Sequence, residues 1–312
     1  MTRTPLIIDC DPGVDDAIAL LLAFASPDEL DILAITTLGG NVSADLTARN
    51  ACIIRQIAGR EDVPVHAGAR RPLVREPVGA GEFHGKTGLG SLELFEPAGK
   101  ISPGHSAQVI IDHVMRAPSG SITLTLLGPM TNLALAMRLE PAIIPRLGPV
   151  IVMAGARSEG GNITASAEYN VFADPHAAHV VLSSGARIIV HGLDATHRVR
   201  TTPQRIARFA ASDTPEAQTA AKLLKFSADV QQEIVGDGGA PIHDPCPIAW
   251  IIAPQLFKSR PADIRIETVS PLTLGHTAVE FRLGDPAAAR HHWVTHADAD
   301  GLFNLIAERL TQ

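Results

Sequence analysis

Hydrophobic positions along the chain form short runs, separated by segments with helical periodicity. The runs are Leu6–Cys10, Leu33–Leu38, Ile122–Leu127, Val150–Ala154 and Arg187–Gly192. Short continuous apolar runs are typical of strands buried on both faces, and the segments between them are long enough for crossover helices. We therefore predict an α/β fold: an open, mostly parallel sheet with helices on both faces.

The first predicted helix follows the first strand directly. Asp15 and Asp16 offer negative charge to its start, and Ala17–Ala25 continues as a good helix former. We expect the helix to end before Pro27.

The rest of the chain departs from this alternation in two places. Between His66 and His105 it is rich in Gly and Pro with little periodicity, which predicts a long functional loop. From Ile264 on, two alternating segments around Ser270–Gly275 predict antiparallel strands added at a sheet edge, and we expect a last helix after Asp300.

Composition narrows the class of protein. Of the 312 residues, 46% are hydrophobic and no Ser/Gly/Pro-rich linker interrupts the pattern, so we expect one domain over residues 1–312. A net charge of -7 without basic runs argues against nucleic acid or an anionic membrane as partner. Met1–Pro5 shows no signal-peptide pattern and no stretch reaches transmembrane length, so we expect a cytoplasmic protein. Three scattered cysteines suggest buried free thiols.

Four carboxylates stand in the turn after the first strand: Asp9, Asp11, Asp15 and Asp16. Ligands of open α/β sheets bind at the carboxyl ends of strands, where this turn lies. No Lys, Arg or His between Arg3 and Arg49 neutralises the cluster, so we expect a cation among the acids. Hard oxygen ligands favour Ca²⁺ or Mg²⁺ over zinc. Alternatively, Asp15 and Asp16 only cap the helix, and Asp9 and Asp11 are solvated.

The turn belongs to a series of motifs that resembles one family. Its sequence Asp-Cys-Asp-Pro-Gly-Val-Asp-Asp-Ala looks like the amino-terminal signature of the inosine–uridine-preferring nucleoside hydrolases. Further motifs follow in that family's order and approximate spacing: Ile35-Thr36-Thr37 with Gly40-Asn41, Gly128-Pro129-Met130-Thr131-Asn132, Gly161-Asn162 with Glu168-Tyr169-Asn170, and His243-Asp244-Pro245. The resemblance covers nearly the whole chain.

The resemblance implies calcium-dependent hydrolysis of the N-glycosidic bond of purine or pyrimidine ribonucleosides, giving ribose and a free base. It assigns Ca²⁺ to Asp11, Asp16, Asp244 and the main-chain carbonyl of Leu127. Carboxylates plus a carbonyl are a suitable calcium ligand set. Without the other motifs, Asp244 would be interpreted as a helix cap before Pro245.

The family's ribose-binding residues map onto Asp15, Asn41, Asn162, Glu168 and Asn170, with Met153 and Tyr169 nearby. Amides donate and accept hydrogen bonds while a carboxylate accepts from hydroxyls, which suits a sugar. Any one of these residues alone would be interpreted as part of an ordinary polar loop.

The implied mechanism is attack of a metal-activated water on the anomeric carbon through an oxocarbenium-like state. Asp11 is the candidate base, and His243, the histidine of the His-Asp motif, is the candidate donor to the leaving base. His84, in the long loop where the family has a base-side histidine, is the second candidate donor.

The chain departs from the family pattern at several positions. It reads Met-Ala-Gly at 153–155 where Met-Gly-Gly is usual, Ala165 replaces a common proline, Tyr169 replaces a frequent Phe, and Thr87 replaces an often acidic residue. The helical segment Leu223–Val235 lacks the tyrosines that many members place near the base, because Tyr169 is the only Tyr of the chain. Base preference therefore stays open.

Two other functions were weighed. Asp9-Cys10-Asp11 after a strand also resembles the haloacid-dehalogenase-like phosphatases, but that class leaves Asp15-Asp16, Gly161-Asn162 and His243-Asp244 unexplained. A non-catalytic nucleoside-binding protein of the same fold would bind its ligand without releasing ribose. From the family we expect a homodimer or homotetramer.

Overall fold

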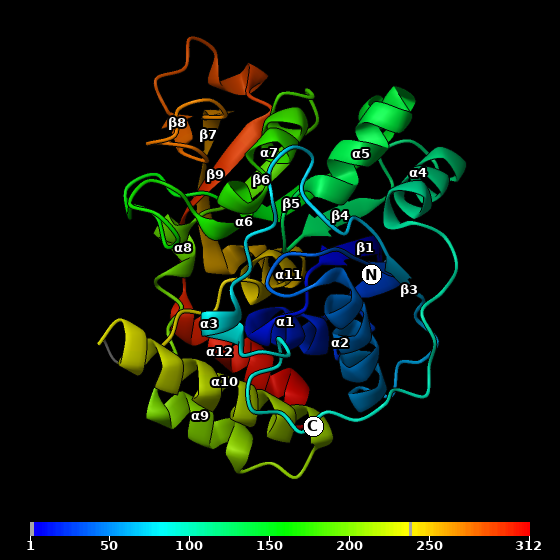
Figure 1. Ribbon diagram of the computed structural model, residues 1–312, viewed down its shortest axis with the longest axis vertical. Coiled ribbons are helices and arrows are strands. Elements are labelled where there is room, and N and C mark those ends of the chain that lie inside the picture. The colour runs from blue at the N-terminus through cyan, green and yellow to red at the C-terminus, as the bar shows by residue number, and fades with distance from the viewer. Residues whose placement is uncertain (1–2, 237–238) are drawn as a thin grey trace.

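The computed structural model describes residues 3–236 and 239–312. Within them, nine strands form one sheet of order β3-β2-β1-β4-β5-β6-β9-β7-β8 (Figure 1). The strands are β1 (Thr4–Cys10), β2 (Leu30–Thr37), β3 (Val65–Ala67), β4 (Thr123–Leu126), β5 (Val150–Met153), β6 (Ile188–His191), β7 (Phe257–Ile266), β8 (Thr277–Glu280) and β9 (His291–Ala297). The sheet is parallel from β3 to β9, whereas β7 and β8 at its edge pair antiparallel.

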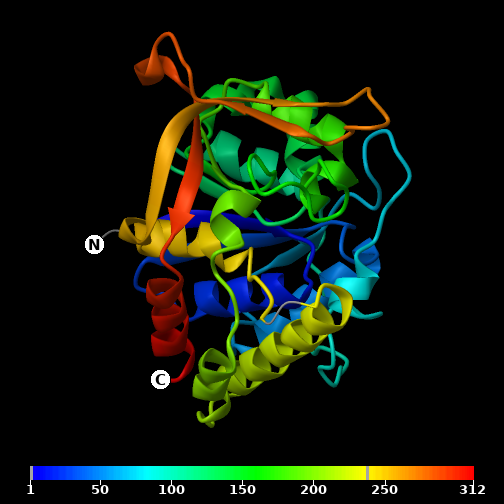
Figure 2. The same cartoon turned by 90° about the vertical axis from the view of Figure 1, so that its left-hand side faces the viewer.

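Helices cover both faces of this sheet. The α-helices are α1 (Val14–Phe24), α2 (Ala44–Ile57), α3 (Gly81–His84), α4 (Ser106–Arg116), α5 (Thr131–Leu139), α6 (Tyr169–Ala173), α7 (Pro175–Leu182), α8 (Leu193–Thr196), α9 (Pro203–Ala210), α10 (Pro215–Ile234), α11 (Pro245–Ile252) and α12 (Ala299–Leu310). Three short 3₁₀ turns are η1 (Pro141–Arg146), η2 (Pro254–Leu256) and η3 (Pro286–Ala288). Helices α1, α2, α10, α11 and α12 lie on one face, and α4, α5 and α7 on the other (Figure 2).

Strand β1 shows why the sheet is covered twice. Leu6 and Ile8 pack into the core under α1, whereas Ile7 between them packs into the core under α4 and α5. All three side chains are fully buried. Successive side chains point to opposite faces of a strand, so a continuous apolar run is stable only when both faces are covered.

The predicted α/β class is confirmed. The five predicted strands correspond to β1, β2, β4, β5 and β6, with ends that differ by up to three residues. The predicted antiparallel edge strands are present as β7 and β8, although β7 begins at Phe257, before the predicted start at Ile264. The prediction missed β3 and also β9, which lies between β6 and β7 and runs parallel to β6. Its neighbours come from distant parts of the chain, which a local pattern does not reveal.

Helix α1 begins as the acidic residues indicated. Asp16 Oδ2 accepts a hydrogen bond of 2.9 Å from the N–H of Gly13, the residue before the helix. Asp16 therefore does cap the start of α1. The helix ends at Phe24, before Pro27 as predicted.

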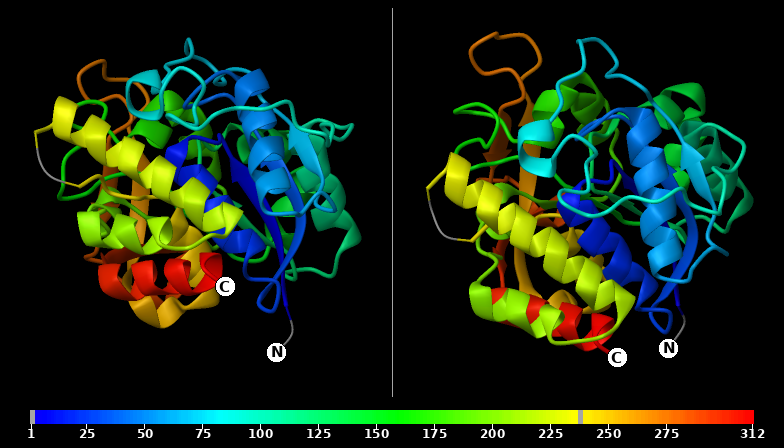
Figure 3. Two further views of the ribbon diagram at one scale, coloured as in Figure 1. Left: turned by 90° about the horizontal axis from the view of Figure 1, so that it is seen from below. Right: turned by 60° about the horizontal axis from the view of Figure 1, so that its bottom comes forward.

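The long loop predicted between His66 and His105 contains more structure than expected. It begins within β3 and includes the single-turn helix α3. Figure 3 shows the long helix α10 lying beside α1 and packed on α9 and α12. Helix α10 also contacts α3, so the loop is held against the helical layer that covers this face of the sheet.

Two other expectations concern burial and membranes. Cys10, Cys52 and Cys246 are buried free thiols, as predicted. Among the described residues, no helix is both long and apolar enough to cross a membrane. Residues 1–2, part of the segment Met1–Pro5 in which no signal peptide was recognised, lie outside the described residues.

Candidate active site

The candidate residues gather where the direction of strand order reverses. From β1 the chain proceeds through β2 to β3 on one side of the sheet, and from β4 through β5 to β6 on the other. Asp11 follows β1, and Leu127 follows the neighbouring strand β4. The carboxyl edge at such a switch point is open because the flanking connections run away from each other, and it is where ligands of open α/β sheets bind.

Three carboxyl groups converge at this edge. One oxygen each from Asp15, Asp16 and Asp244 lies within 4.8 Å of the others. Asp16 is fully buried, Asp244 is 4% exposed and Asp15 is 9% exposed. Asp244 stands at the N-cap position of α11, but its side chain makes no capping hydrogen bond there, so capping does not account for its carboxylate. Three converging acids with so little water between them require protons or a cation.

Asp11 lies beside this cluster in a narrow space. A Cβ atom on Gly40 would come within 2.0 Å of Asp11 Oδ2, and one on Gly128 within 2.2 Å of Oδ1. Asp11 Oδ2 accepts 2.7 Å from the N–H of Asn41. The other oxygen, Oδ1, is buried and has no hydrogen-bond partner within the described chain. An orphaned buried carboxylate oxygen fits a cation ligand, because nothing else offsets its loss of hydration.

The alternative that Asp9 and Asp11 are solvated is wrong. Asp9 is fully buried and Asp11 is 1% exposed. Asp9 Oδ1 accepts 2.6 Å from the hydroxyl of Thr36 and 2.8 Å from the amide of Asn132. Burial nevertheless raises the pKa of Asp9 to about 7.

The electrostatics of the cluster show the cost of assembling it without a cation. Burial, followed by the charge of Asp15, raises the pKa of Asp16 to about 7 and that of Asp244 well above its usual range. Asp16 and Asp244 lie so close together that a proton on either carboxyl group relieves the repulsion between them. Burial, then the charge of Asp16, likewise raises the pKa of Asp11. A divalent cation would replace this proton and lower all of these pKa values.

Asn41 holds the acidic turn together. Its side-chain N–H₂ donates to the main-chain oxygen of Asp11 and to Asp16 Oδ2, both over 3.1 Å. The same residue lines the pocket next to the cluster. Its amide donors therefore serve the acids, which is more than the predicted role of contacting a sugar.

Glu168, the first residue of the Glu168-Tyr169-Asn170 motif, bonds this motif to the segment that follows β5. The residue is 2% exposed. Its Oε2 accepts from the N–H groups of Gly155 (2.8 Å) and Val171 (3.1 Å), and its Oε1 accepts from Asn170 (2.8 Å). Burial outweighs these hydrogen bonds and raises the pKa of Glu168 to about 7. Oε1 carries one of these bonds and can still accept from a hydroxyl.

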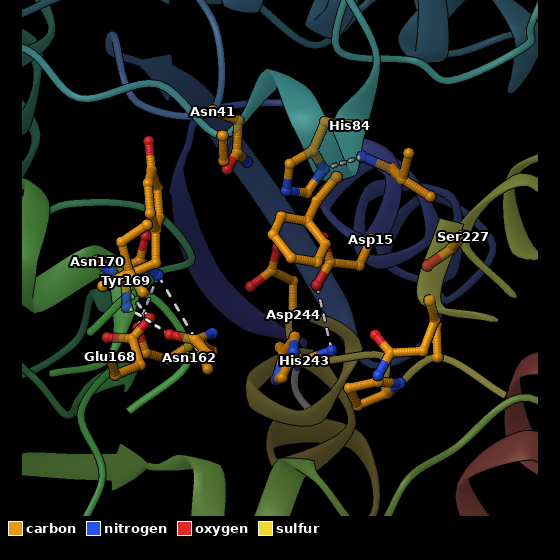
Figure 4. Close-up of a pocket in the computed structure, with 18 of the residues that line it drawn as sticks. Asp15, Asn41, His84, Asn162, Glu168, Tyr169, Asn170, Ser227, His243 and Asp244 are labelled. Carbon is orange, nitrogen blue, oxygen red and sulfur yellow. Dashed lines mark hydrogen bonds between the residues drawn. The ribbon is translucent and has the colours of Figure 1, made fainter. Parts of the chain in front are cut away.

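The two amides of this motif are oriented by main-chain contacts. Asn170 donates 2.7 Å to the carbonyl of Leu127 and 3.1 Å to that of Met153. Asn162 accepts 2.9 Å from the N–H of Tyr169, which leaves its N–H₂ group to the pocket side (Figure 4). The carbonyl of Leu127 has a second lone pair available.

His243 lies on the opposite side of the pocket from these amides (Figure 4). Its main-chain N–H donates a hydrogen bond of 3.2 Å to Asp15 Oδ2, and its ring nitrogen Nδ1 lies 2.8 Å from the hydroxyl oxygen of Thr196. Burial lowers the pKa of His243 to about 4, although the charge of Asp15 acts against this. The imidazole is therefore neutral at pH 7.

His84 is fixed in one tautomer. Its Nδ1 accepts 3.0 Å from the main-chain N–H of Val14, the first residue of α1. Because Nδ1 must carry a lone pair to do so, the neutral ring carries its hydrogen on Nε2. Burial lowers the pKa of His84 and favours this neutral form.

A pocket of about 590 Å³ unites these groups. Its lining includes the predicted residues Asp15, Asn41, His84, Leu127, Met153, Asn162, Glu168, Tyr169, Asn170, His243 and Asp244. Asp11 and Asp16 do not line it, since they lie buried behind Asn41 and Asp15. The predicted site residues are thus brought together around one cavity and the carboxyl cluster at its base.

The sequence interpretation missed one wall of this pocket. It contains Glu159, His197, Arg200, Ser227 and Gln231. His197 Nδ1 is 3.2 Å from Glu159 Oε2. His197 and Arg200 follow β6, so the rule that ligands bind at carboxyl ends of strands could have found them. Ser227 and Gln231 lie on α10, within the segment 223–235 that the resemblance places near the base, although no local motif marks them.

A doubly covered parallel sheet with a polar pocket at its switch point is typical of α/β proteins that bind a small molecule. The family profile of inosine–uridine-preferring nucleoside hydrolases matches residues 6–304, and the chain belongs to this family. It is a nucleoside hydrolase, which cleaves N-glycosidic bonds of ribonucleosides. This assignment excludes the phosphatase alternative.

Individual relatives agree over their whole length. The chain is 41% identical to the pyrimidine-specific ribonucleoside hydrolase RihA of Photobacterium profundum, with 98% of each chain covered. It is 37% identical to the inosine–uridine-preferring nucleoside hydrolase of Crithidia fasciculata, covering 98% of this chain and 96% of the relative. A solved plant nucleoside hydrolase superposes with a TM-score of 0.92 at 31% identity and 99% coverage of both chains.

Proposed function

We propose that this protein hydrolyses purine or pyrimidine ribonucleosides to ribose and free base in a reaction that depends on Ca²⁺. The convergence of Asp15, Asp16 and Asp244 within 4.8 Å is the observation that carries this proposal. Beside them, Asp11 Oδ1 is buried without a partner among the described residues. A hard divalent cation would offset the mutual repulsion of these acids and satisfy that oxygen.

Four groups would hold the ion: the carboxylates of Asp11, Asp16 and Asp244 and the carbonyl of Leu127. An all-oxygen set of this kind favours Ca²⁺ or Mg²⁺ over zinc, which prefers nitrogen and sulfur. Ca²⁺ tolerates irregular geometry better than Mg²⁺. When bound, Ca²⁺ supplies positive charge that acidifies a nucleophilic water and orients ribose hydroxyls.

Polar groups beside His243 and across the pocket from it would bind the sugar. Asp15 has one carboxylate oxygen besides the one that accepts from His243, and Glu168 Oε1 has one lone pair left after bonding Asn170. Both can accept from ribose hydroxyls. Asn162 and Asn170, together with Asn41, provide amides beside them, and Met153 packs nearby.

The chain's own groups would then carry out the chemistry. Asp11 would take a proton from the attacking water, because its Oδ1 has no partner among the described residues and keeps a second lone pair when it also holds the cation. Glu168 and the neighbouring acids stabilise the positive charge that develops on the sugar as the glycosidic bond breaks.

Two neutral imidazoles would assist the leaving base. Nε2 of His84 carries a hydrogen because Nδ1 accepts from Val14. His243 can present Nε2–H in the same way when the hydroxyl of Thr196 donates to its Nδ1. A nucleobase anion is a poor leaving group, so a hydrogen bond from either ring lowers the barrier. We propose His243 as the main donor and His84 as a second contact to the base.

The preferred base is the open part of this proposal. The compared relatives are named pyrimidine-specific and inosine–uridine-preferring. Ser227 and Gln231 of α10 line this chain's pocket, so polar side chains stand where many family members have tyrosines. Rates on uridine, cytidine, inosine, adenosine and guanosine measure the preference directly.

The deciding experiment measures ribose release by protein stripped of metal and verified by elemental analysis. We expect no release without metal and recovery with Ca²⁺. Full activity of verified metal-free protein would refute the calcium requirement. A nucleoside that raises the melting temperature of the calcium-loaded protein but frees no ribose would refute turnover.

Oligomeric state and location remain predictions. We propose a homodimer or homotetramer, which light scattering of the purified protein tests. Cytoplasmic location is tested by fractionating the source cells.

A further inference from the structure

Residues 73–84, between β3 and α4, form a strap along one wall of the pocket. Its first part is fastened to α6 and the residue after it. The N–H of Leu73 donates 2.8 Å to Asp174 Oδ2. The guanidinium of Arg75 donates a hydrogen bond to the main-chain carbonyl of Phe172. It also lies over the Phe172 ring, 4.0 Å from the ring centre. The strap therefore follows α6, the helix that begins next to Glu168.

The other end of the strap reaches the opposite side of the pocket. The N–H of Ala80 donates 3.0 Å to the carbonyl of Asn41. Helix α3 follows, and its last residue, His84, accepts 3.0 Å from the N–H of Val14. One short segment thus spans the distance between the ribose-binding motif and the imidazole of His84.

Tyr169 connects these two parts. Its hydroxyl donates 2.7 Å to the carbonyl of Val78, in the middle of the strap. Its ring, 9% exposed, belongs to a small apolar cluster with Ala80 and Ala173. In the sequence it stands directly between Glu168 and Asn170. The hydroxyl is engaged by the strap, so its first role is to hold the protein rather than a substrate.

We propose that Tyr169 is a positioning residue whose hydroxyl fixes the strap to the ribose-binding motif and thereby places His84 against the leaving base. The proposal rests on the proposed function, which assigns Glu168 and Asn170 to ribose and His84 to the base.

The substitution Tyr169→Phe isolates the hydroxyl. A neutral buried hydrogen bond has a net value of about 0.5–1.5 kcal/mol, which corresponds to a change of about 2- to 12-fold. We expect kcat/KM for uridine and inosine to fall by a factor in this range. With 4-nitrophenyl riboside, whose leaving group departs as a stable anion, we expect less than a twofold change, because His84 has little to contribute there.

A matched control removes a comparable bond elsewhere. Ser26 is fully buried, and its hydroxyl donates 2.8 Å to the carbonyl of Leu22 near the end of α1. Ser26→Ala should lower the melting temperature without changing the ratio of rates on the two kinds of substrate. An equal loss on both substrates in Tyr169→Phe would show a merely structural role and overturn the proposal.

A double-mutant cycle tests the route through His84. In a His84→Ala background, Tyr169→Phe should no longer change the substrate ratio. Additive losses would mean that Tyr169 acts independently of His84, and would overturn the proposal. If His84→Ala does not fold, hydrogen exchange of residues 73–84 decides: it should accelerate in Tyr169→Phe, and unchanged exchange contradicts the strap. Failure of the wild-type protein to hydrolyse either substrate would instead refute the proposed function.

Discussion

The main-chain N–H of His243 donates a hydrogen bond to Asp15 Oδ2 over 3.2 Å, which joins the turn after β1 to the loop before α11. Asp16 and Asp244, the neighbours of these two residues, each place a carboxylate oxygen within 4.8 Å of the other. The carboxyl cluster therefore brings together residues from the first and last thirds of the chain. Binding of a cation there should stabilise the fold as a whole.

The first prediction separates metal binding from folding by Asp244→Asn. The amide can still donate to Asp16 but removes one negative charge and one ligand. Without metal, the variant should melt at the same temperature as the wild type or higher, because like-charge repulsion falls. Ca²⁺ at 100 times its Kd should stabilise the wild type by about 2.7 kcal/mol, and the variant should show little shift.

Asp16→Ala is the contrasting variant. Asp16 also accepts from the N–H groups of Asp11 and Gly13, so its loss should destabilise even the metal-free protein by about 1–2 kcal/mol. Calorimetry with and without Ca²⁺ distinguishes the two variants. A normal calcium shift in Asp244→Asn would remove Asp244 from the ligand set.

The second prediction concerns the 2′-hydroxyl of the substrate. Asp15 retains a carboxylate oxygen for a hydroxyl donor, and Asn170 lies across the pocket from it. A 2′-deoxynucleoside would leave these buried groups unpaired. We expect kcat/KM for deoxyuridine to be lower than for uridine by a factor on the order of 10²–10⁴. Equal rates on the two substrates would contradict the ribose assignment.

The third prediction follows from a buried histidine outside the pocket. His191, in β6, is fully buried, and neither ring nitrogen has a partner within the described residues. Its ring meets Trp250 and Phe257 edge-on. Burial lowers the pKa of His191 from 6.5 to about 3. The folded state therefore binds fewer protons than the unfolded state between these values, and its stability falls as the pH drops below 6.5.

His191→Leu removes this dependence. Relative to the variant, the wild type should lose about 1.4 kcal/mol of unfolding free energy per pH unit below the unfolded pKa, or about 2 kcal/mol at pH 5. Urea unfolding of both proteins at several pH values measures the difference. A constant difference from pH 8 to pH 5 would show that His191 takes up its proton at the same pH in the folded and unfolded states.

Much of the fold was predictable because its strands are local. Runs such as Val150–Ala154 are continuous and apolar, and their burial on both faces follows from that pattern. Strand β9 was missed because its place beside β6 depends on pairing between distant segments. Contacts at large sequence separation are not encoded in periodicity.

The site, like the fold, has a part that the sequence indicated and a part that it did not. The acids and amides stand in compact motifs, so the sequence indicated them. The resemblance was needed to assign their roles. Their internal hydrogen bonds were not predictable: Asn41 bonds the acidic turn, and Tyr169 bonds the strap. Ser227 and Gln231 line the pocket because α10 packs over it, and only the resemblance, not a local motif, placed this segment near the base.

The last prediction tests His243 as the donor to the leaving base. His243→Ala should lower turnover on natural nucleosides by a factor on the order of 10²–10³, the range for loss of one hydrogen-bond donor to a developing anion, and should retain most activity on 4-nitrophenyl riboside. Thr196→Val removes the hydroxyl 2.8 Å from Nδ1, so the ring loses control of its tautomer and the same selective loss should follow, about tenfold. Thr196→Ser keeps the hydroxyl and should restore the rate. Equal losses on both substrates would mean that His243 supports the carboxyl cluster through Asp15, and no loss on uridine or inosine would transfer the donor role to His84.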